Sequence, residues 1–195
     1  MSRQPRAEAT RARLLSATLE SLHERGYSGT STQEVCRRAG VSRGTLLHHF
    51  PTRIDLLVAA LDTILSERVA GFVDAHQGAS MPLPILLRRL WGQWEGPVYA
   101  AWLELAVAAR TEPALQAPMR SVMARFDADI LAAFQTLVDT DGLPPQVAAV
   151  IPFLTFAVFN GLAVGWGYND SGQEEPVLEL LERLAGLLPI LRGVL

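Results

Sequence analysis

Residues 31–50 read S-T-Q-E-V-C-R-R-A-G-V-S-R-G-T-L-L-H-H-F, and this stretch decides the fold that the chain is expected to adopt. Ser31 is a favourable N-cap for a short helix, and Glu34 stands at the capping-box position three residues later. Gly40 can adopt the left-handed backbone conformation that ends a helix, and Ser42 can then cap a second one. Two short helices joined by a glycine turn are typical of a helix-turn-helix.

The second helix of such a motif enters the major groove of DNA, so its exposed face is the candidate binding surface. If Leu46 and Phe50 point inward, a rotation of about 100° per residue places Gly44 and His48 most directly outward. Gly44 would let the backbone approach the floor of the groove, and His48 carries a donor and an acceptor for base edges. Arg43, in the first turn, can reach a guanine or a phosphate.

The segment G-V-S-R-G-T-L-L-H-H-F-P-T-R-I-D-L-L, from Gly40 to Leu57, resembles the signature of the TetR family of bacterial one-component regulators. The resemblance implies an all-helical homodimer with an N-terminal DNA-binding domain and a larger C-terminal domain for ligand binding and dimerisation. By position, it implies that Arg53 contacts a phosphate. The resemblance also implies that four residues face the groove: Arg43, Thr45, His48 and His49.

Leu47 departs from the family pattern, in which a tyrosine at this position usually contacts a phosphate through its hydroxyl group. Leucine cannot make that hydrogen bond, so either one phosphate contact is lost or Leu47 touches a thymine methyl group or a sugar. The complete set of residues predicted to contact DNA is Ser31, Thr32, Ser42, Arg43, Gly44, Thr45, Leu47, His48, His49 and Arg53.

The net charge of -3 is unevenly distributed along the chain. Residues 1–56 contain nine arginines and five acidic residues, a net charge of +4. Residues 57–195 contain eight arginines and fifteen acidic residues, a net charge of -7. The positive charge thus lies at the end predicted to bind DNA, where phosphate contacts require it. The chain has no lysine, so arginine must supply every cationic contact by a basic side chain.

Cys36 is the only cysteine, which excludes an intramolecular disulfide and is typical of a reducing cytoplasm. It lies inside the helix-turn-helix and is predicted to be a small core residue. The N-terminal residues M-S-R-Q-P-R-A-E contain no apolar segment that would direct export. A cytoplasmic location is therefore expected.

An all-α fold of about nine helices is expected, because apolar residues recur at helical spacing and no strand alternation is evident. Residues 1–8 are predicted to be a polar, mobile tail, with an arm in which Arg3 and Arg6 follow the DNA backbone as the alternative. The first helix would start near Ala9 and stop at Gly26. Beyond the first four helices, the others are predicted at about residues 85–94, 97–110, 113–140, 144–168 and 176–191.

Two domains are expected: a three-helix DNA-binding domain at residues 1–52 and a helical effector-binding and dimerisation domain at residues 53–195. The fourth helix, at about 53–76, would connect them, and a rigid helix fixed in both domains can transmit a tilt. A homodimer is required because one short recognition helix reads too few bases. Two such helices can read half-sites about 34–36 Å apart.

The stretch from Val147 to Tyr168 contains no charge and is long enough to span a bilayer. Its flanks are acidic, and no arginine lies between Arg125 and Arg183, which contradicts the pattern of membrane anchoring. The preferred interpretation is a helix buried on all sides, with ligand on one face and a partner subunit on the other. The residues predicted to form the dimer interface are Phe159, Gly161, Gly165, Leu181, Leu184 and Leu188.

All four tryptophans lie at or beyond residue 91, which favours an apolar effector cavity, with an ordinary aromatic core as the alternative. The amide of Asn160 would contact ligand or form a hydrogen bond across the dimer. If the effector is anionic, one of Arg110, Arg120 and Arg125 should face inward; otherwise all three lie on the surface. The residues predicted to line the cavity are Trp94, Trp102, Phe126, Phe153, Phe156 and Asn160.

The predicted function is a DNA-binding repressor that a small, largely apolar effector releases from a palindromic operator. The alternatives are a helical ligand- or partner-binding dimer that has lost specific DNA binding, supported only by Leu47, and a small all-α enzyme. No phosphate loop, nucleophile elbow or H-E-x-x-H motif occurs. His48 and His49 point about 100° apart on a helix and cannot chelate one ion together. No catalytic residue, metal or cofactor is therefore expected.

Overall fold

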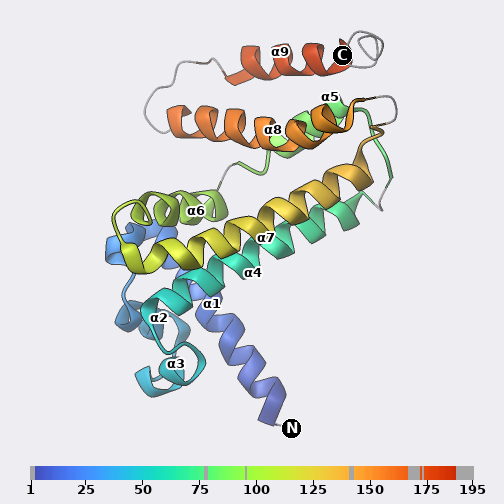
Figure 1. The fold of residues 1–195 in the computed structure, drawn as a ribbon. Helices are drawn as coiled ribbons and strands as arrows, with labels where there is room; N and C mark the ends of the chain where they lie inside the picture. The colour runs from blue at the N-terminus through green and yellow to red at the C-terminus, as the bar shows by residue number, and fades with distance from the viewer. Residues whose placement is uncertain are drawn as a thin grey trace. The chain divides into compact units, whose positions relative to one another are not determined.

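The computed structural model describes residues 3–76, 79–94, 96–140, 143–166, 172 and 174–187. Within these residues the chain forms nine α-helices and no strand, which confirms the all-α prediction (Figure 1). The helices are α1 Arg3–Gly29, α2 Thr32–Ala39, α3 Arg43–His49, α4 Arg53–Ala75, α5 Leu83–Trp91, α6 Pro97–Ala108, α7 Pro113–Leu137, α8 Pro145–Trp166 and α9 Glu174–Leu187.

The first helix starts earlier than the sequence predicted, because the residues expected to form a mobile tail are helical from Arg3 onward. Apart from Pro5, which a helix tolerates in its first turn, residues 3–8 are arginine, glutamine, alanine and glutamate, all good helix formers. The hydroxyl group of Thr10 also donates a hydrogen bond of 2.9 Å to the carbonyl oxygen of Arg6. Gly26 interrupts the helix as predicted, with φ 66° and ψ -175°, and only a short turn follows it.

The chain divides into two compact units. The first unit comprises Met1–Glu67 and Gly96–Phe126, and the second comprises Arg68–Glu95 and Asp127–Leu195. Helices α4 and α7 contribute residues to both units. The division at residue 52 concerns functional domains and stays a prediction.

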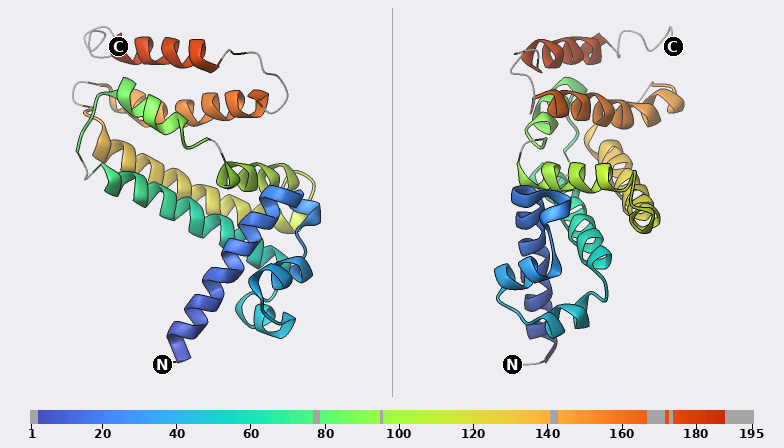
Figure 2. Two further views of the ribbon diagram at one scale, coloured as in Figure 1. Left: turned by 180° about the vertical axis from the view of Figure 1, so that it is seen from behind. Right: turned by 90° about the vertical axis from the view of Figure 1, so that its left-hand side faces the viewer.

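Two apolar clusters form the core of the first unit. The first cluster joins α1, α2 and α3 through Leu14, Val35, Leu46 and Phe50. α2 packs against α1, and α3 packs against α2 (Figure 2). The helix-turn-helix therefore rests on its own small core. The second cluster connects α1 with α4, α6 and α7, and its buried members are Leu22, Leu57, Leu61, Leu65, Ala101, Leu105, Leu115, Met119 and Val122.

The second unit also has two apolar clusters. In one, Phe134 of α7 packs with Leu86 of α5, and in the other Phe159 of α8 packs with Leu178 of α9. α8 leaves one of its faces open to solvent in a single chain, and the burial of this face by a partner subunit stays a prediction. The large apolar side chains exposed on α8 are Val150, Phe153, Leu154 and Val164. By length and composition alone, Pro145–Val164 is the one described helix segment that could cross a membrane.

Candidate functional site

The caps of the helix-turn-helix have the geometry that the sequence predicts. The Oγ atom of Ser31 accepts a hydrogen bond of 3.1 Å from the backbone N–H of Glu34. Gly40 has φ 63° and ψ 39°, in the left-handed region, and its N–H donates to the carbonyl oxygen of Cys36. Ser42 Oγ accepts a hydrogen bond of 3.1 Å from the N–H of Thr45. Local side-chain chemistry therefore sets the angle at which α3 leaves α2.

The carboxylate of Glu34 has a different role from the capping box that the sequence suggested. The N–H of Ser31 donates to the carbonyl oxygen of Gly29, at 3.2 Å, so it does not require that carboxylate. Glu34 instead accepts hydrogen bonds of 2.7 Å from both Arg37 and Arg38. These hydrogen bonds, from Arg37 first and Arg38 second, lower the pKa of Glu34 to about 2.

The exposed face of α3 is the predicted one. Leu46 is completely buried, whereas Gly44 and His48 are exposed. Arg43 is also exposed, on the first turn of the helix. Leu47 is 41% exposed, so it lies on the accessible side of the helix and not in the core.

The remaining residues predicted to contact DNA differ in their exposure and in whether their polar groups already form hydrogen bonds. Ser31 and Ser42 are exposed caps, and Thr32 is half-buried. The hydroxyl groups of Thr45 and Ser42 lie 2.9 Å apart, so each is already hydrogen-bonded to the other. His49 is half-buried, and its ring centroid lies 6.3 Å from that of Phe50. Contact of these residues with DNA stays a prediction.

Arg53 has an internal role that the sequence did not predict. Its Nε donates a hydrogen bond of 2.7 Å to the carbonyl oxygen of Thr30, and its Nη2 donates to that of Tyr27. The guanidinium also lies over the ring of Tyr27, 4.2 Å from the centroid. Arg53 thus ties the start of α4 to the turn between α1 and α2. Its phosphate contact stays a prediction, and it would have to use donors that these carbonyl oxygens leave available.

The same turn is held from α6 as well. The backbone N–H of Tyr27 donates a hydrogen bond of 2.6 Å to Oε2 of Glu104. A Cβ atom on Gly26 would stand 2.7 Å from that carboxylate oxygen, and the φ of Gly26 is positive. The positive φ therefore favours glycine at this position, and a Cβ atom would also force the Glu104 carboxylate to shift.

The residues predicted to line an effector cavity are divided between the two units. In the first unit, Trp102 and Phe126 pack against the apolar core, and Trp102 Nε1 donates to the sulfur atom of Met123. In the second unit, the ring centroids of Trp94 and Phe156 lie 5.7 Å apart. The last two predicted cavity residues also belong to the second unit, where Phe153 is exposed and Asn160 is half-buried.

Asn160 is bonded within its own helix, because its Nδ2 donates a hydrogen bond of 2.6 Å to the carbonyl oxygen of Phe156. Phe159, predicted to be a dimer residue, is completely buried within the second unit, where it contacts Trp91 and Trp94 edge to face. Phe159 thus packs inside its own chain, and its part in a dimer interface stays a prediction.

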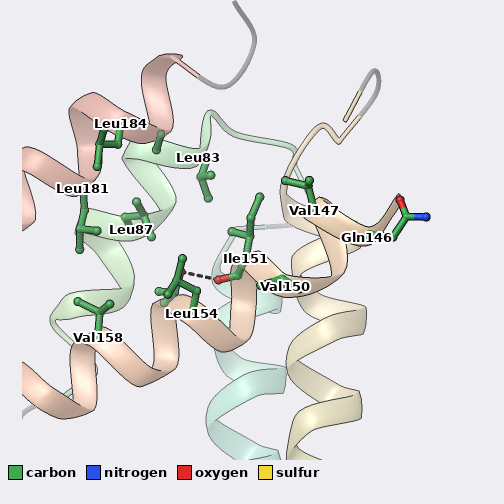
Figure 3. A pocket seen from close by; sticks show the side chains of 12 residues that line it. Leu83, Leu87, Gln146, Val147, Val150, Ile151, Leu154, Val158, Leu181 and Leu184 are labelled. Carbon is green, nitrogen blue, oxygen red and sulfur yellow. Dashed lines mark hydrogen bonds between the residues drawn. The ribbon is translucent and has the colours of Figure 1, made fainter. Parts of the chain in front are cut away.

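A groove of about 450 Å³ runs between α5, α8 and α9 of the second unit (Figure 3). Its lining is apolar apart from Gln146 and Thr155, and the Thr155 hydroxyl group already donates to the carbonyl oxygen of Ile151. Two of the predicted dimer residues, Leu181 and Leu184, line this groove. Of the others, Gly161 is exposed with open space around it, Gly165 lies near the end of α8, and Leu188 lies outside the described residues.

Arg68 is a residue that the sequence analysis missed. The three arginines that could have faced an anionic effector are all exposed, namely Arg110, Arg120 and Arg125. Arg68 of α4 is instead half-buried, and its Nε donates a hydrogen bond of 2.9 Å to Oε1 of Gln93. The available signal was its spacing, because it follows the buried Leu65 at the helical interval of three residues.

Comparison with known proteins agrees with the geometry of the helix-turn-helix. Residues 14–60 match the family model of the bacterial regulatory proteins of the tetR family. An uncharacterized HTH-type transcriptional regulator of Mycobacterium tuberculosis is 34% identical over 192 residues, which cover 95% of this chain and 98% of that protein. These relatives are transcriptional regulators and not enzymes.

Solved structures show the same fold along most of the chain. A TetR-family transcriptional regulator from Rhodococcus is similar with a TM-score of 0.72 and 27% identity, covering 93% of this chain and 98% of that one. The multidrug binding protein EbrR, crystallised with ethidium, is similar with a TM-score of 0.65 and 27% identity. The match covers 90% of this chain and 97% of EbrR. With a family match across the helix-turn-helix and a relative that spans nearly its whole length, the chain belongs to the TetR family of bacterial transcriptional regulators.

Proposed function

We propose that this DNA-binding regulator is a cytoplasmic repressor that occupies a palindromic operator as a homodimer and leaves it when a small, largely apolar effector binds. The observation that carries the proposal is the exposed face of α3, where Arg43, Gly44 and His48 face solvent. Leu46 anchors the same helix in the core from behind. A second helix supported in this way can read base edges in the major groove.

The open apolar face of the second unit supports a dimer. Contiguous apolar patches on soluble proteins mark interaction surfaces, and a second copy of the chain would remove these side chains from water. A two-fold dimer would also present two copies of α3 to half-sites about 34–36 Å apart. The exposed large apolar residues on α8 and α9 are Val150, Phe153, Leu154, Val164, Leu180, Leu184 and Leu187.

The aromatic cluster around Trp94 supports an effector site in the second unit. EbrR, a structural neighbour, was crystallised with ethidium, which is a flat aromatic molecule. Effector binding would shift α5 to α7 and tilt α4, which has residues in both units. An effector that favours the released state by ~3 kcal/mol would weaken operator binding more than a hundredfold.

One observation favours a second candidate, a ligand- or partner-binding dimer that no longer binds DNA specifically. Leu47 stands exposed on the recognition face, where the resemblance to the family predicts a tyrosine. The loss of one phosphate hydrogen bond removes only about 1 kcal/mol, which is too little to abolish binding. The repressor is therefore the preferred function.

Fluorescence anisotropy with the full-length protein and labelled duplex DNA from upstream of its own gene tests the proposal. We expect binding that prefers the palindrome to a scrambled duplex and weakens steeply as salt rises, because phosphate contacts release counterions. Equal affinity for both duplexes would refute specific recognition and favour the second candidate.

A further inference from the structure

Arg68 is a desolvated cation without an acidic partner. Arg68 is half-buried, and within the described ranges no carboxylate lies within 4.0 Å of its guanidinium, although six other arginines form such ion pairs. Burial lowers the pKa of Arg68, because it penalises the charged form. A buried charge is ordinarily paired, so this guanidinium is compensated only in part by the protein itself.

Among the residues that the structure describes, the hydrogen-bond partner of Arg68 is the neutral amide of Gln93, which orients it. Gln93 Oε1 accepts the hydrogen bond from Nε, and this leaves the two terminal amino groups of the guanidinium available. Those two groups form a planar fork that matches the two oxygens of a carboxylate. Gln93 is thus a positioning residue that presents the fork.

A second hydrogen-bond donor without an acceptor lies in Trp94, the residue after Gln93 in the segment that follows α5. The indole Nε1 atom of Trp94 is buried and has no hydrogen-bond partner among the described residues. The Trp94 ring packs edge to face against Phe156 and Phe159, with centroids 5.7 Å and 5.0 Å away. Trp91 packs edge to face against Phe159 as well. Gln93, which binds Arg68, and Trp94, which belongs to the aromatic cluster, are thus consecutive residues of the second unit.

We propose that the effector is an organic acid whose carboxylate binds the fork of Arg68 and whose apolar body packs against the aromatic cluster of Trp91, Trp94 and Phe156. This inference rests on the proposed ligand-responsive function and specifies its ligand class. An anion supplies the acceptors that the donors of Arg68 and Trp94 lack. An effector without charge would leave the guanidinium uncompensated.

Isothermal titration calorimetry with the full-length protein and no DNA tests the inference. The probes are two matched pairs, 1-naphthoate with 1-naphthamide and decanoate with decanamide, which differ in charge and hardly in shape. We expect at least one acid to bind about tenfold more tightly than its amide. Failure of both acids to bind below about 1 mM, or equal binding of acids and amides, would overturn the inference.

Two substitutions identify the residue responsible. Arg68→Met should weaken binding of the acid about tenfold or more and leave that of the amide nearly unchanged. Gln93→Glu should have the same effect, because the new carboxylate would pair with Arg68 and occupy it, and it should raise the melting temperature. Arg120→Met removes the same charge from an exposed position and should change neither affinity.

The outcomes separate this inference from the repressor function. If Arg68→Met and Gln93→Glu keep both their fold and wild-type affinity for the acid, the carboxylate site is refuted, whatever happens at the operator. If the acid binds as expected but the wild-type protein does not recognise its operator, the repressor function fails and the ligand class stands.

Discussion

The backbone N–H of Tyr27 lies 2.6 Å from Oε2 of Glu104, and this hydrogen bond joins the turn after α1 to α6 across 77 positions of sequence. The carboxylate occupies the space in front of Gly26, which has a positive φ. From α4, Arg53 donates hydrogen bonds to the carbonyl oxygens of Tyr27 and Thr30 in the same turn. The turn that precedes the helix-turn-helix is therefore clamped between α4 and α6.

Gly26→Ala should lower the free energy of unfolding by about 1–3 kcal/mol, measured by urea denaturation, because alanine is strained at positive φ. Its Cβ would also collide with Glu104. In the double variant with Glu104→Ala that collision is gone, so the two effects should not add. Gly71→Ala, at a helical glycine with open space, is the control and should stabilise by about 0.5–1 kcal/mol. Strict additivity of the pair would contradict the clamp.

Glu34→Gln should destabilise the protein at neutral pH and lose its effect in acid. The folded-state pKa of Glu34, about 2, lies below its ordinary value of 4.5 because Arg37 and Arg38 donate hydrogen bonds to the carboxylate. The ionised group therefore stabilises the folded state fully above pH 4.5, and this contribution disappears as the pH falls from 4.5 toward 2. Urea denaturation at several pH values, with exposed Glu8→Gln as the control, measures the difference. A difference that is constant with pH would exclude this role.

The parts of the site that were predicted correctly from sequence are those that short-range chemistry determines. Ser31, Gly40 and Ser42 act within three or four residues of themselves, so their types alone indicate the caps and the turn. The contacts of Arg53 and Glu104 depend on residues 23 and 77 positions away, which no local pattern reveals.

A similar limit applies to the C-terminal helices. The uncharged stretch around Phe159 indicated an apolar helix, but not that Phe159 packs against Trp91 and Trp94 of its own chain. Arg68 was missed because charge normally implies exposure, and only its neighbours show that it is half-buried. Burial of a charged or aromatic side chain is decided by tertiary packing.

Gly161→Ala should distinguish a dimer interface on α8 from a solvated surface. Within one chain a Cβ atom at Gly161 meets no atom within 4 Å, so alanine should stabilise the helix by about 0.5–1 kcal/mol, as at Gly71. If Gly161 permits close approach of a partner helix, the substitution should instead weaken the dimer. Sedimentation equilibrium over a range of concentrations measures this. Unchanged dimerisation would remove Gly161 from the interface.

Leu47→Tyr should strengthen operator binding by about 1 kcal/mol, roughly fivefold, because the new hydroxyl group can donate to a phosphate. Leu47 is already 41% exposed, so the larger side chain has room without disturbing the core. Fluorescence anisotropy gives the affinity, and the salt dependence should stay the same because the added group is neutral. An unchanged affinity would mean that no phosphate contact is missing at this position.

Arg43→Ala should weaken operator binding by about 1–3 kcal/mol and relax the preference for one base pair, if the exposed guanidinium reads a guanine edge. A set of operator duplexes, each altered at one base pair, measures the preference by competition. Arg183→Ala removes the same charge from an exposed position on α9 and should leave binding unchanged. A loss that is equal on every duplex, with the salt slope reduced by about 1, would assign Arg43 to a phosphate instead. The two contacts differ in this way because only base edges carry sequence information, whereas every phosphate presents the same charge.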